Sequence, residues 1–105
     1  MTNPPMSYGN VPSSPRAELL DEAKRLVCGD RQDDYGPPSE SFSRIALTMT
    51  ALGFRAPGGG NIMPHDVSLL LICVKLARLV NSPELKDGWL DVAGYAALGA
   101  ECAGA

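Results

Sequence analysis

The sequence predicts an all-α protein: a compact bundle of about four helices, preceded by a disordered N-terminal arm. Apolar residues recur at helical spacing, no segment alternates apolar and polar residues as a half-buried strand does, and Pro and Gly separate four periodic stretches. A chain of 105 residues is long enough for one hydrophobic core but too short for two. We therefore expect an arm over residues 1–13 and a single helical domain over residues 14–105.

The arm and the first helix are separated by a clear helix start. Pro4, Pro5 and Pro12 lie in a segment with almost no periodic apolar pattern, which predicts disorder. Ser14 then suits the N-cap of a helix, and Pro15 suits its first position. The buried face of this helix is predicted to consist of Leu19, Leu20, Ala23, Leu26 and Val27.

The second helix follows a loop over residues 29–38 that is rich in Gly, Pro and Asp. We expect Ser39 to cap this helix and Gly53 to end it. Its apolar residues fall on one face at helical spacing. They are Phe42, Ile45, Ala46, Met49 and Leu52.

The last two helices are predicted from Pro64 onward and over residues 86–102. From Val67 to Val80 the third helix is apolar almost all round, which is typical of a central helix covered by neighbours on most sides. The fourth carries a face of small residues that permits close approach of another helix. This face is Ala93, Ala96, Ala97 and Ala100. Because a core of this size is marginal alone, we expect a homodimer.

Charge and composition exclude several classes of protein. Twelve acidic against nine basic residues give a formal net charge of -3, which argues against binding of duplex nucleic acid through its phosphates. The longest apolar run, Leu69 to Val74, is too short for a membrane helix, and no signal peptide pattern opens the chain. We therefore expect no membrane partner and a cytoplasmic location. Cys28, Cys73 and Cys102 fit neither a disulfide scaffold nor a zinc site and are expected as buried thiols.

Four charged residues near the junction of the last two helices form the first candidate site. Lys75 and Arg78 are three residues apart and share a helix face; Asp87 and Asp91 are four apart and share another. Two carboxylates at this spacing can hold a hydrated Mg²⁺, and the two cations can bind the phosphates of a ligand. The alternative is that Asp91 pairs with one of the cations and joins the helices, while Asp87 suits a helix start for any function.

The loop over residues 29–38 is the second candidate. Gln32 can hydrogen-bond a base edge, Tyr35 can stack on its ring, and Arg31 can reach a phosphate, with Asp30 beside them. The alternative is that the Asp residues form turns and that Tyr35 packs on a neighbouring proline.

Three other residues favour a structural role. Glu40 is most simply the partner of Arg44 in a surface ion pair, although a metal-ligand role is the alternative. His65 is predicted to be solvated at a helix start, and Trp89 to anchor the core or an interface.

Five segments carry a resemblance to a known family, over residues 16–102. They are Gly29-Asp30-Arg31-Gln32 with Tyr35-Gly36, Glu40-Ser41-Phe42-Ser43-Arg44-Ile45-Ala46, Asp66-Val67, Lys75-Leu76-Ala77-Arg78, and Asp87 with Asp91-Val92-Ala93-Gly94-Tyr95-Ala96-Ala97. They resemble an uncharacterised family of small phage and prophage proteins. The last segment is similar to the tail of a helical domain associated with nucleotide modification in phages. Both are distantly similar to MazG-like, all-α nucleoside triphosphate pyrophosphohydrolases.

The resemblance implies a nucleotide-binding phage protein in the host cytoplasm, with Mg²⁺-dependent pyrophosphohydrolysis of a (deoxy)nucleoside triphosphate as its activity. Asp87 and Asp91, with Glu40, would then hold Mg²⁺, and Lys75 would act with them in catalysis. The substrate-binding set would be Asp30, Arg31, Gln32, Tyr35, Arg78 and Tyr95.

The sequence departs from the MazG-like pattern at its acids. Those enzymes carry a Glu-x-x-Glu pair and a Glu-x-x-Asp pair, whereas this chain has no Glu-x-x-Glu and spaces its last acids Asp-x-x-x-Asp. Met63 also stands where the phage family commonly has a Ser or Thr cap, which weakens the start of the third helix. The alternative function is therefore a non-catalytic phage protein that binds or inhibits a host protein.

Overall fold

A computed structural model describes residues 14–29 and 37–105, and in these ranges the chain forms four α-helices and no strand. They are α1 (Pro15–Cys28), α3 (Pro38–Ala51), α4 (Pro64–Asn81) and α5 (Lys86–Ala103). The predicted all-α class is confirmed. The predicted arm over residues 1–13 lies outside the described residues.

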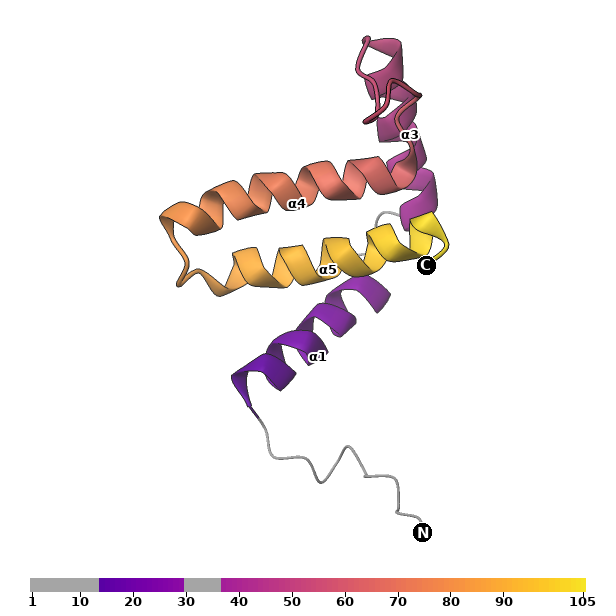
Figure 1. Ribbon diagram of the computed structural model, residues 1–105. Coiled ribbons are helices and arrows are strands. Elements are labelled where there is room, and N and C mark those ends of the chain that lie inside the picture. The colour runs from indigo at the N-terminus through magenta and orange to yellow at the C-terminus, as the bar shows by residue number, and fades with distance from the viewer. Residues whose placement is uncertain (1–13, 30–36) are drawn as a thin grey trace.

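The helices α4 and α5 form an antiparallel pair that organises the molecule (Figure 1). α1 packs against α5 on the side away from α4. α3 runs across the end of the pair where α4 begins and α5 ends, and contacts both helices there. The opposite end of the pair, where the chain turns from α4 into α5, is therefore free of α3.

The helix boundaries follow local sequence signals. In α1 the Ser14 hydroxyl accepts a hydrogen bond from the Ala17 N–H at 3.2 Å, as expected of an N-cap. α3 begins two residues earlier than predicted, because Pro38 occupies its first turn and Pro37, not Ser39, is the N-cap. Proline suits this position, since its fixed φ is already helical and its missing N–H would have no partner there.

The main core lies where α3 meets the α4–α5 pair. Phe42 and Ala46 of α3 are buried against Ile62 and Val67. Half-buried residues pack around these four: Met49, Ala56, Leu71, Tyr95, Leu98 and Cys102. The predicted face of α3 is therefore only partly covered, and Leu52 is among its exposed residues. The helix crosses the end of the pair instead of lying along it, so only part of its length meets the core.

Glycines let α5 approach its neighbours closely. A Cβ at Gly99 would lie 2.6 Å from the Ser68 Oγ, and one at Gly88 would lie 2.6 Å from a Leu79 methyl group. Ser68 is itself buried and its hydroxyl donates to the Tyr95 carbonyl oxygen, one turn before Gly99. The close packing of α4 on α5 therefore comes from glycines and a buried serine. Three alanines of the predicted small-residue face, Ala96, Ala97 and Ala100, are exposed.

Three expectations about burial are wrong. In α1, Leu20 of the predicted buried face is 62% exposed, and Ala23 is the buried residue of that helix. α4 is not covered on most sides: within it only Val67, Ser68 and Leu79 are buried. Its large apolar residues Leu69, Leu70, Val74, Leu76 and Val80 are exposed. The reason is that α1 packs on α5 and not on α4, so α4 has a neighbour along one side only. The cysteines are also not uniformly buried, since Cys28 and Cys73 are exposed and Cys102 is half-buried.

Among the described helices, none combines the length and the apolar character that crossing a membrane requires.

Candidate functional site

Lys75 and Asp91 meet between the two central helices. The Lys75 Nζ lies 2.8 Å from the Asp91 Oδ2, and the two side chains are only 21% and 17% exposed. Lys75 lies on the same face of α4 as the buried Ser68 and Leu79, so it points toward α5. A charge-assisted hydrogen bond at this distance, largely shielded from water, is stronger than a surface ion pair. The structure therefore brings together one cation and one acid of the predicted site.

Arg78 and Asp87 extend this pair toward the free end of the molecule. Arg78 lies one turn beyond Lys75 in α4, and Asp87 lies one turn before Asp91 in α5. Both are exposed. In an antiparallel pair these positions lie at the same end, so the four charged residues gather near the turn between α4 and α5. We call these four residues the hairpin cluster.

Tyr95 belongs to the core and not to the hairpin cluster. Its side chain is half-buried and packs against the residues that α3 and α4 contribute to the core. Along α5 it follows Asp91 by one helical turn, so it is farther from the connection between α4 and α5 and closer to α3. A contact between its ring and a ligand at the hairpin cluster stays a prediction.

Glu40 lies far from the other proposed metal ligands. It is in the first turn of α3, close in sequence to Phe42, and Phe42 belongs to the core cluster against which Cys102 at the end of α5 packs. Asp87 is fifteen residues from Cys102 along the same helix, a separation of about 22 Å. The structure thus does not bring Glu40 and Asp87 together.

The donor set does not fit a magnesium centre. Across residues 14–29 and 37–105 no three His, Cys, Asp or Glu side chains are grouped so that they could hold a metal ion. Asp91 is engaged by Lys75, and Asp87 is the one other carboxylate of the hairpin cluster. Mg²⁺ needs oxygen ligands and is repelled by an ammonium group at bonding distance from one of them.

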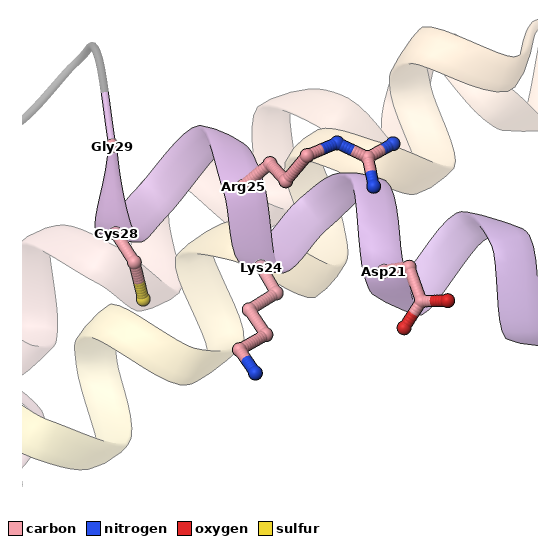
Figure 2. A pocket seen from close by; sticks show the side chains of 5 residues that line it. All are labelled: Asp21, Lys24, Arg25, Cys28 and Gly29. Carbon is pink, nitrogen blue, oxygen red and sulfur yellow. The ribbon is translucent and has the colours of Figure 1, made fainter. Parts of the chain in front are cut away.

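The predicted loop residues Asp30, Arg31, Gln32 and Tyr35 lie outside the described residues. The described chain just before them, at the end of α1, has an open hollow of about 590 Å³. Its lining is polar in part and consists of Asp21, Lys24, Arg25, Cys28 and Gly29. Figure 2 shows that the Arg25 side chain points away from those of Asp21, Lys24 and Cys28, so these groups do not converge on one point.

A further ion pair attaches α1 to α5. The Lys86 Nζ lies 2.9 Å from the Glu22 Oε1, at the surface. The hydrogen bond and the charge of Glu22 raise the pKa of Lys86 above its usual value. The pair aligns the middle of α1 with the start of α5, near the hairpin cluster.

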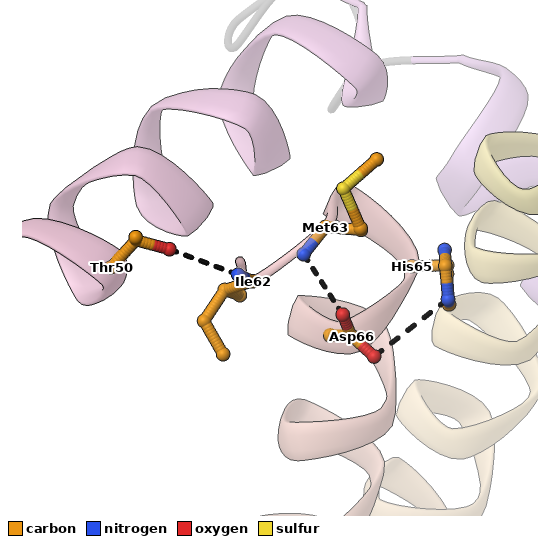
Figure 3. A network of polar contacts seen from close by, with 5 residues as sticks. All are labelled: Thr50, Ile62, Met63, His65 and Asp66. Carbon is orange, nitrogen blue, oxygen red and sulfur yellow. Dashed lines mark hydrogen bonds and ion pairs between the residues drawn. The ribbon is translucent and has the colours of Figure 1, made fainter. Parts of the chain in front are cut away.

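The start of α4 is a polar network without catalytic geometry (Figure 3). The Met63 N–H donates to the Asp66 carboxylate at 2.8 Å, and the Ile62 N–H donates to the Thr50 hydroxyl at 2.9 Å. Asp66 therefore supplies the cap that Met63 cannot, since a methionine side chain lacks a strong acceptor. His65 lies 3.7 Å from the other Asp66 oxygen and is half-exposed, which fits a structural role.

Sequence reasoning missed two residues that position the hairpin cluster. Ser68 is a polar residue in an apolar helix. Its hydrogen bond to the Tyr95 carbonyl oxygen fixes the position of α4 along the axis of α5. Gly88 lies between Asp87 and Asp91 and lets the Leu79 side chain approach the α5 backbone. The available signals were a polar residue within an apolar helix and glycines within a helix, which are otherwise unfavourable there.

Comparison with known proteins places the chain among proteins of unknown function. A family model described as "Domain of unknown function (DUF6378)" matches residues 18–103. The chain is similar to the Gene 55 protein of Mycobacterium phage D29, with 38% identity over 78 residues that make up 74% of this chain and 48% of that protein. It is also similar to the Gene 55 protein of Mycobacterium phage L5, with 33% identity over 78 residues, 74% of this chain and 47% of that protein. The chain thus spans about half the length of these curated relatives, and no solved structure matches it.

Proposed function

Since the chain belongs to the DUF6378 family, whose function is unknown, we propose its function from its own geometry: the protein binds a nucleotide at the hairpin cluster. The expected relationship to an uncharacterised family of phage proteins is confirmed at this level. The observation that carries the proposal is the Lys75–Asp91 pair at 2.8 Å, with Arg78 and Asp87 one turn away on the same two helices.

Each residue of the cluster has a part that its position supports. Arg78 is exposed and offers paired N–H donors to a phosphate, which a guanidinium binds in bidentate fashion. Lys75 is held beside Arg78 by Asp91, which balances its charge, and its remaining ammonium N–H groups are donors for the ligand. Asp87 is an exposed acceptor that suits ribose hydroxyls. A protein with net charge -3 needs a local cation such as Arg78 to attract an anion.

The proposal is limited to binding. The donor set does not fit Mg²⁺, so we derive no hydrolytic step from the MazG-like resemblance. Recognition of the base by Arg31, Gln32 and Tyr35 stays a prediction, because these residues lie outside the described part of the chain.

A thermal-shift panel tests the proposal. The full chain is heated with each ribo- and deoxyribonucleoside mono-, di- and triphosphate, with and without Mg²⁺. A ligand present at a hundredfold excess over its Kd stabilises the native state by about 2.7 kcal/mol, and Tm rises accordingly. If no nucleotide changes Tm, the proposal fails.

A pair of arginine variants locates the site. Arg78→Gln is expected to abolish the ligand-induced rise in Tm and to leave Tm without ligand nearly unchanged, because Arg78 is exposed. Arg44→Gln, on the exposed side of α3, is the matched control and is expected to bind as the unmodified chain does. Equal ligand responses in the two variants would place the site elsewhere.

A pyrophosphate-release assay separates binding from hydrolysis. We expect no release from any nucleoside triphosphate in the presence of Mg²⁺. Release that disappears in the Asp87→Asn variant would contradict the restriction to binding and support the pyrophosphohydrolase expectation.

The second candidate function is binding of a host protein through the outer face of α5. Trp89 is 45% exposed, and its indole N–H donates to the Pro83 carbonyl oxygen at 2.8 Å, which holds the ring on the surface. Such a ring is a common anchor in protein interfaces. Pull-down from host extract would support this function if one identified protein is retained by Arg78→Gln and lost by Trp89→Ala. Retention by both variants would exclude this face.

A further inference from the structure

The outer side of α4 is an extended apolar surface. We call it the α4 face and define it as Leu69, Leu70, Cys73, Val74, Leu76, Ala77 and Val80. The five large aliphatic residues are 45% to 86% exposed, and Cys73 and Ala77 are exposed as well. Each member has another member three or four residues away, so together they form one continuous face along three turns of the helix.

No described element covers the α4 face. α5 packs on the opposite side of α4, where Ser68 and Leu79 are buried, and α3 contacts the start of the helix. Contiguous apolar surface of this kind on a soluble protein marks an interaction site. The hairpin cluster does not include any residue of the face, so this surface requires its own explanation.

The distribution of charge on α4 identifies the occupant. The first turn contains the acidic Asp66, the last turn contains the basic Arg78, and the only other charged side chain between them, Lys75, points toward α5. Two copies of α4 that pack antiparallel place each acidic end beside a basic end and pair two uncharged stripes between them. A parallel arrangement would put like charges together. The charges at the two ends of α4 therefore favour antiparallel over parallel packing of two copies.

The side-chain sizes fit the same arrangement. Small Cys73 lies near the middle of the stripe, with leucines before it and with Leu76 and Val80 after it. Around a two-fold axis at Cys73, Leu69 and Leu70 of one copy lie opposite the part of the other copy that contains Leu76 and Val80. The small side chain of Cys73 lets the two backbones approach each other.

We propose that the α4 face is the interface of a homodimer, in which α4 of one protomer packs antiparallel against α4 of its partner across a two-fold axis near Cys73. This inference stands without nucleotide binding, although Arg78 belongs both to the hairpin cluster and to the charge pattern of α4.

Light scattering after size-exclusion chromatography tests the dimer. The unmodified chain is expected at twice its 11.1 kDa mass. Leu76→Glu and Val80→Glu, each on the α4 face, are expected at the monomer mass with unchanged helical circular dichroism. Leu47→Glu is the matched control, because Leu47 is 72% exposed on α3 and outside the face, and it is expected to stay dimeric. A monomeric unmodified chain would overturn the proposal and leave the face to a different protein.

Cross-linking tests the position of the axis. A variant that keeps only Cys73 (Cys28→Ser with Cys102→Ala) is treated with a short bis-maleimide, and a variant that keeps only Cys28 is the control. We expect covalent dimers from the Cys73 variant alone, and none once Leu76→Glu is added. Equal cross-linking of the two single-cysteine variants would contradict an axis near Cys73.

Discussion

At the scale of single residues, the Lys75–Asp91 pair decides what the charged residues of the two central helices do. Spacing along each helix placed the cations on one face and the acids on another, and it left open whether Asp91 binds a metal or a lysine. The 2.8 Å contact shows that it binds the lysine. Because both side chains are mostly shielded from water, neither can lose its partner without an unpaired charge remaining in the helix interface.

Removing one partner of this pair is expected to destabilise the fold. Lys75→Met leaves the Asp91 carboxylate without its charged donor, and we expect the free energy of unfolding to fall by about 1–3 kcal/mol. Urea denaturation followed by circular dichroism measures the change. In the double variant Lys75→Met/Asp91→Leu most of the loss should be recovered, since no unpaired charge remains.

The surface pair at α1 is the matched control for this experiment. Lys86→Met removes an equivalent ion pair with Glu22 that is open to solvent, and no measurable change in the urea midpoint is expected. If Lys75→Met and Lys86→Met have equal effects, the Lys75–Asp91 pair is not a structural contact of the interface.

The half-buried Cys102 has a perturbed thiol. Burial raises the pKa of the Cys102 thiol, and the neighbouring charge of Glu101 raises it further, whereas Cys28 is exposed on α1. Only the thiolate reacts, so a raised pKa lowers the reactive fraction at a given pH. In a pH series of iodoacetamide labelling followed by mass spectrometry, Cys102 should reach half its maximal rate at a higher pH in the folded protein than in urea, where the burial is lost. Equal midpoints in buffer and in urea would contradict this assignment.

At the scale of elements, side chains within a few residues determine where a helix begins, whereas side-chain size determines how closely two helices pack. Ser14 caps α1 and Asp66 caps α4, each through a side-chain oxygen within three residues of the N–H it accepts from. The contact between α4 and α5, by contrast, depends on the missing side chain of Gly99 and the hydroxyl of Ser68, 31 positions apart in the sequence.

Gly99→Ala tests this steric contact. A methyl group at this position would lie 2.6 Å from the Ser68 Oγ, so the helices must separate, and we expect a loss of about 1–3 kcal/mol in the free energy of unfolding. In a helix without such a neighbour the same change stabilises by about 0.5–1 kcal/mol. A stabilised Gly99→Ala variant would therefore show that the two helices are not in close contact. Gly60→Ala, in open space, serves as the control and should have little effect.

At the scale of the whole molecule, the fold is a central helix pair with two unequal attachments. α3 contributes Phe42 and Ala46 to the core at one end of the pair. Among the described helices α1 contacts α5 alone, through residues such as Val27 at Gly94 and the Glu22–Lys86 ion pair. Few contacts and an exposed outer side are the features of a unit that opens more easily than the rest.

Native-state hydrogen exchange is expected to follow this arrangement. Amides in the middle of α4 and α5 should exchange most slowly, at rates set by global unfolding, whereas those of α1 should exchange faster through local opening. Mass spectrometry of peptides that cover each helix measures the difference. Equal protection of α1 and α5 would mean that α1 is not a separate opening unit.

The candidate site was predictable only in part. The sequence identified Lys75, Arg78, Asp87 and Asp91 as related positions, because helical periodicity assigns residues to faces. It did not exclude Glu40, since the distance between Glu40 and Asp87 depends on where α3 crosses the α4–α5 pair. The coverage of α4 was mispredicted for the same reason: an apolar residue such as Val80 looks the same in the sequence whether or not a neighbour covers it.

The sequence alone therefore determined the helical class, the number of helices in the described residues and their ends to within about two residues. Caps, prolines and apolar periodicity act over a few neighbouring residues, so local order along the chain is sufficient to specify them. Only the tertiary structure decided that Lys75 binds Asp91, that Glu40 lies near the C-terminal end of α5 and that the α4 face is uncovered. These outcomes depend on how the helices pack against one another, and packing depends on the shapes of side chains that are distant in the sequence.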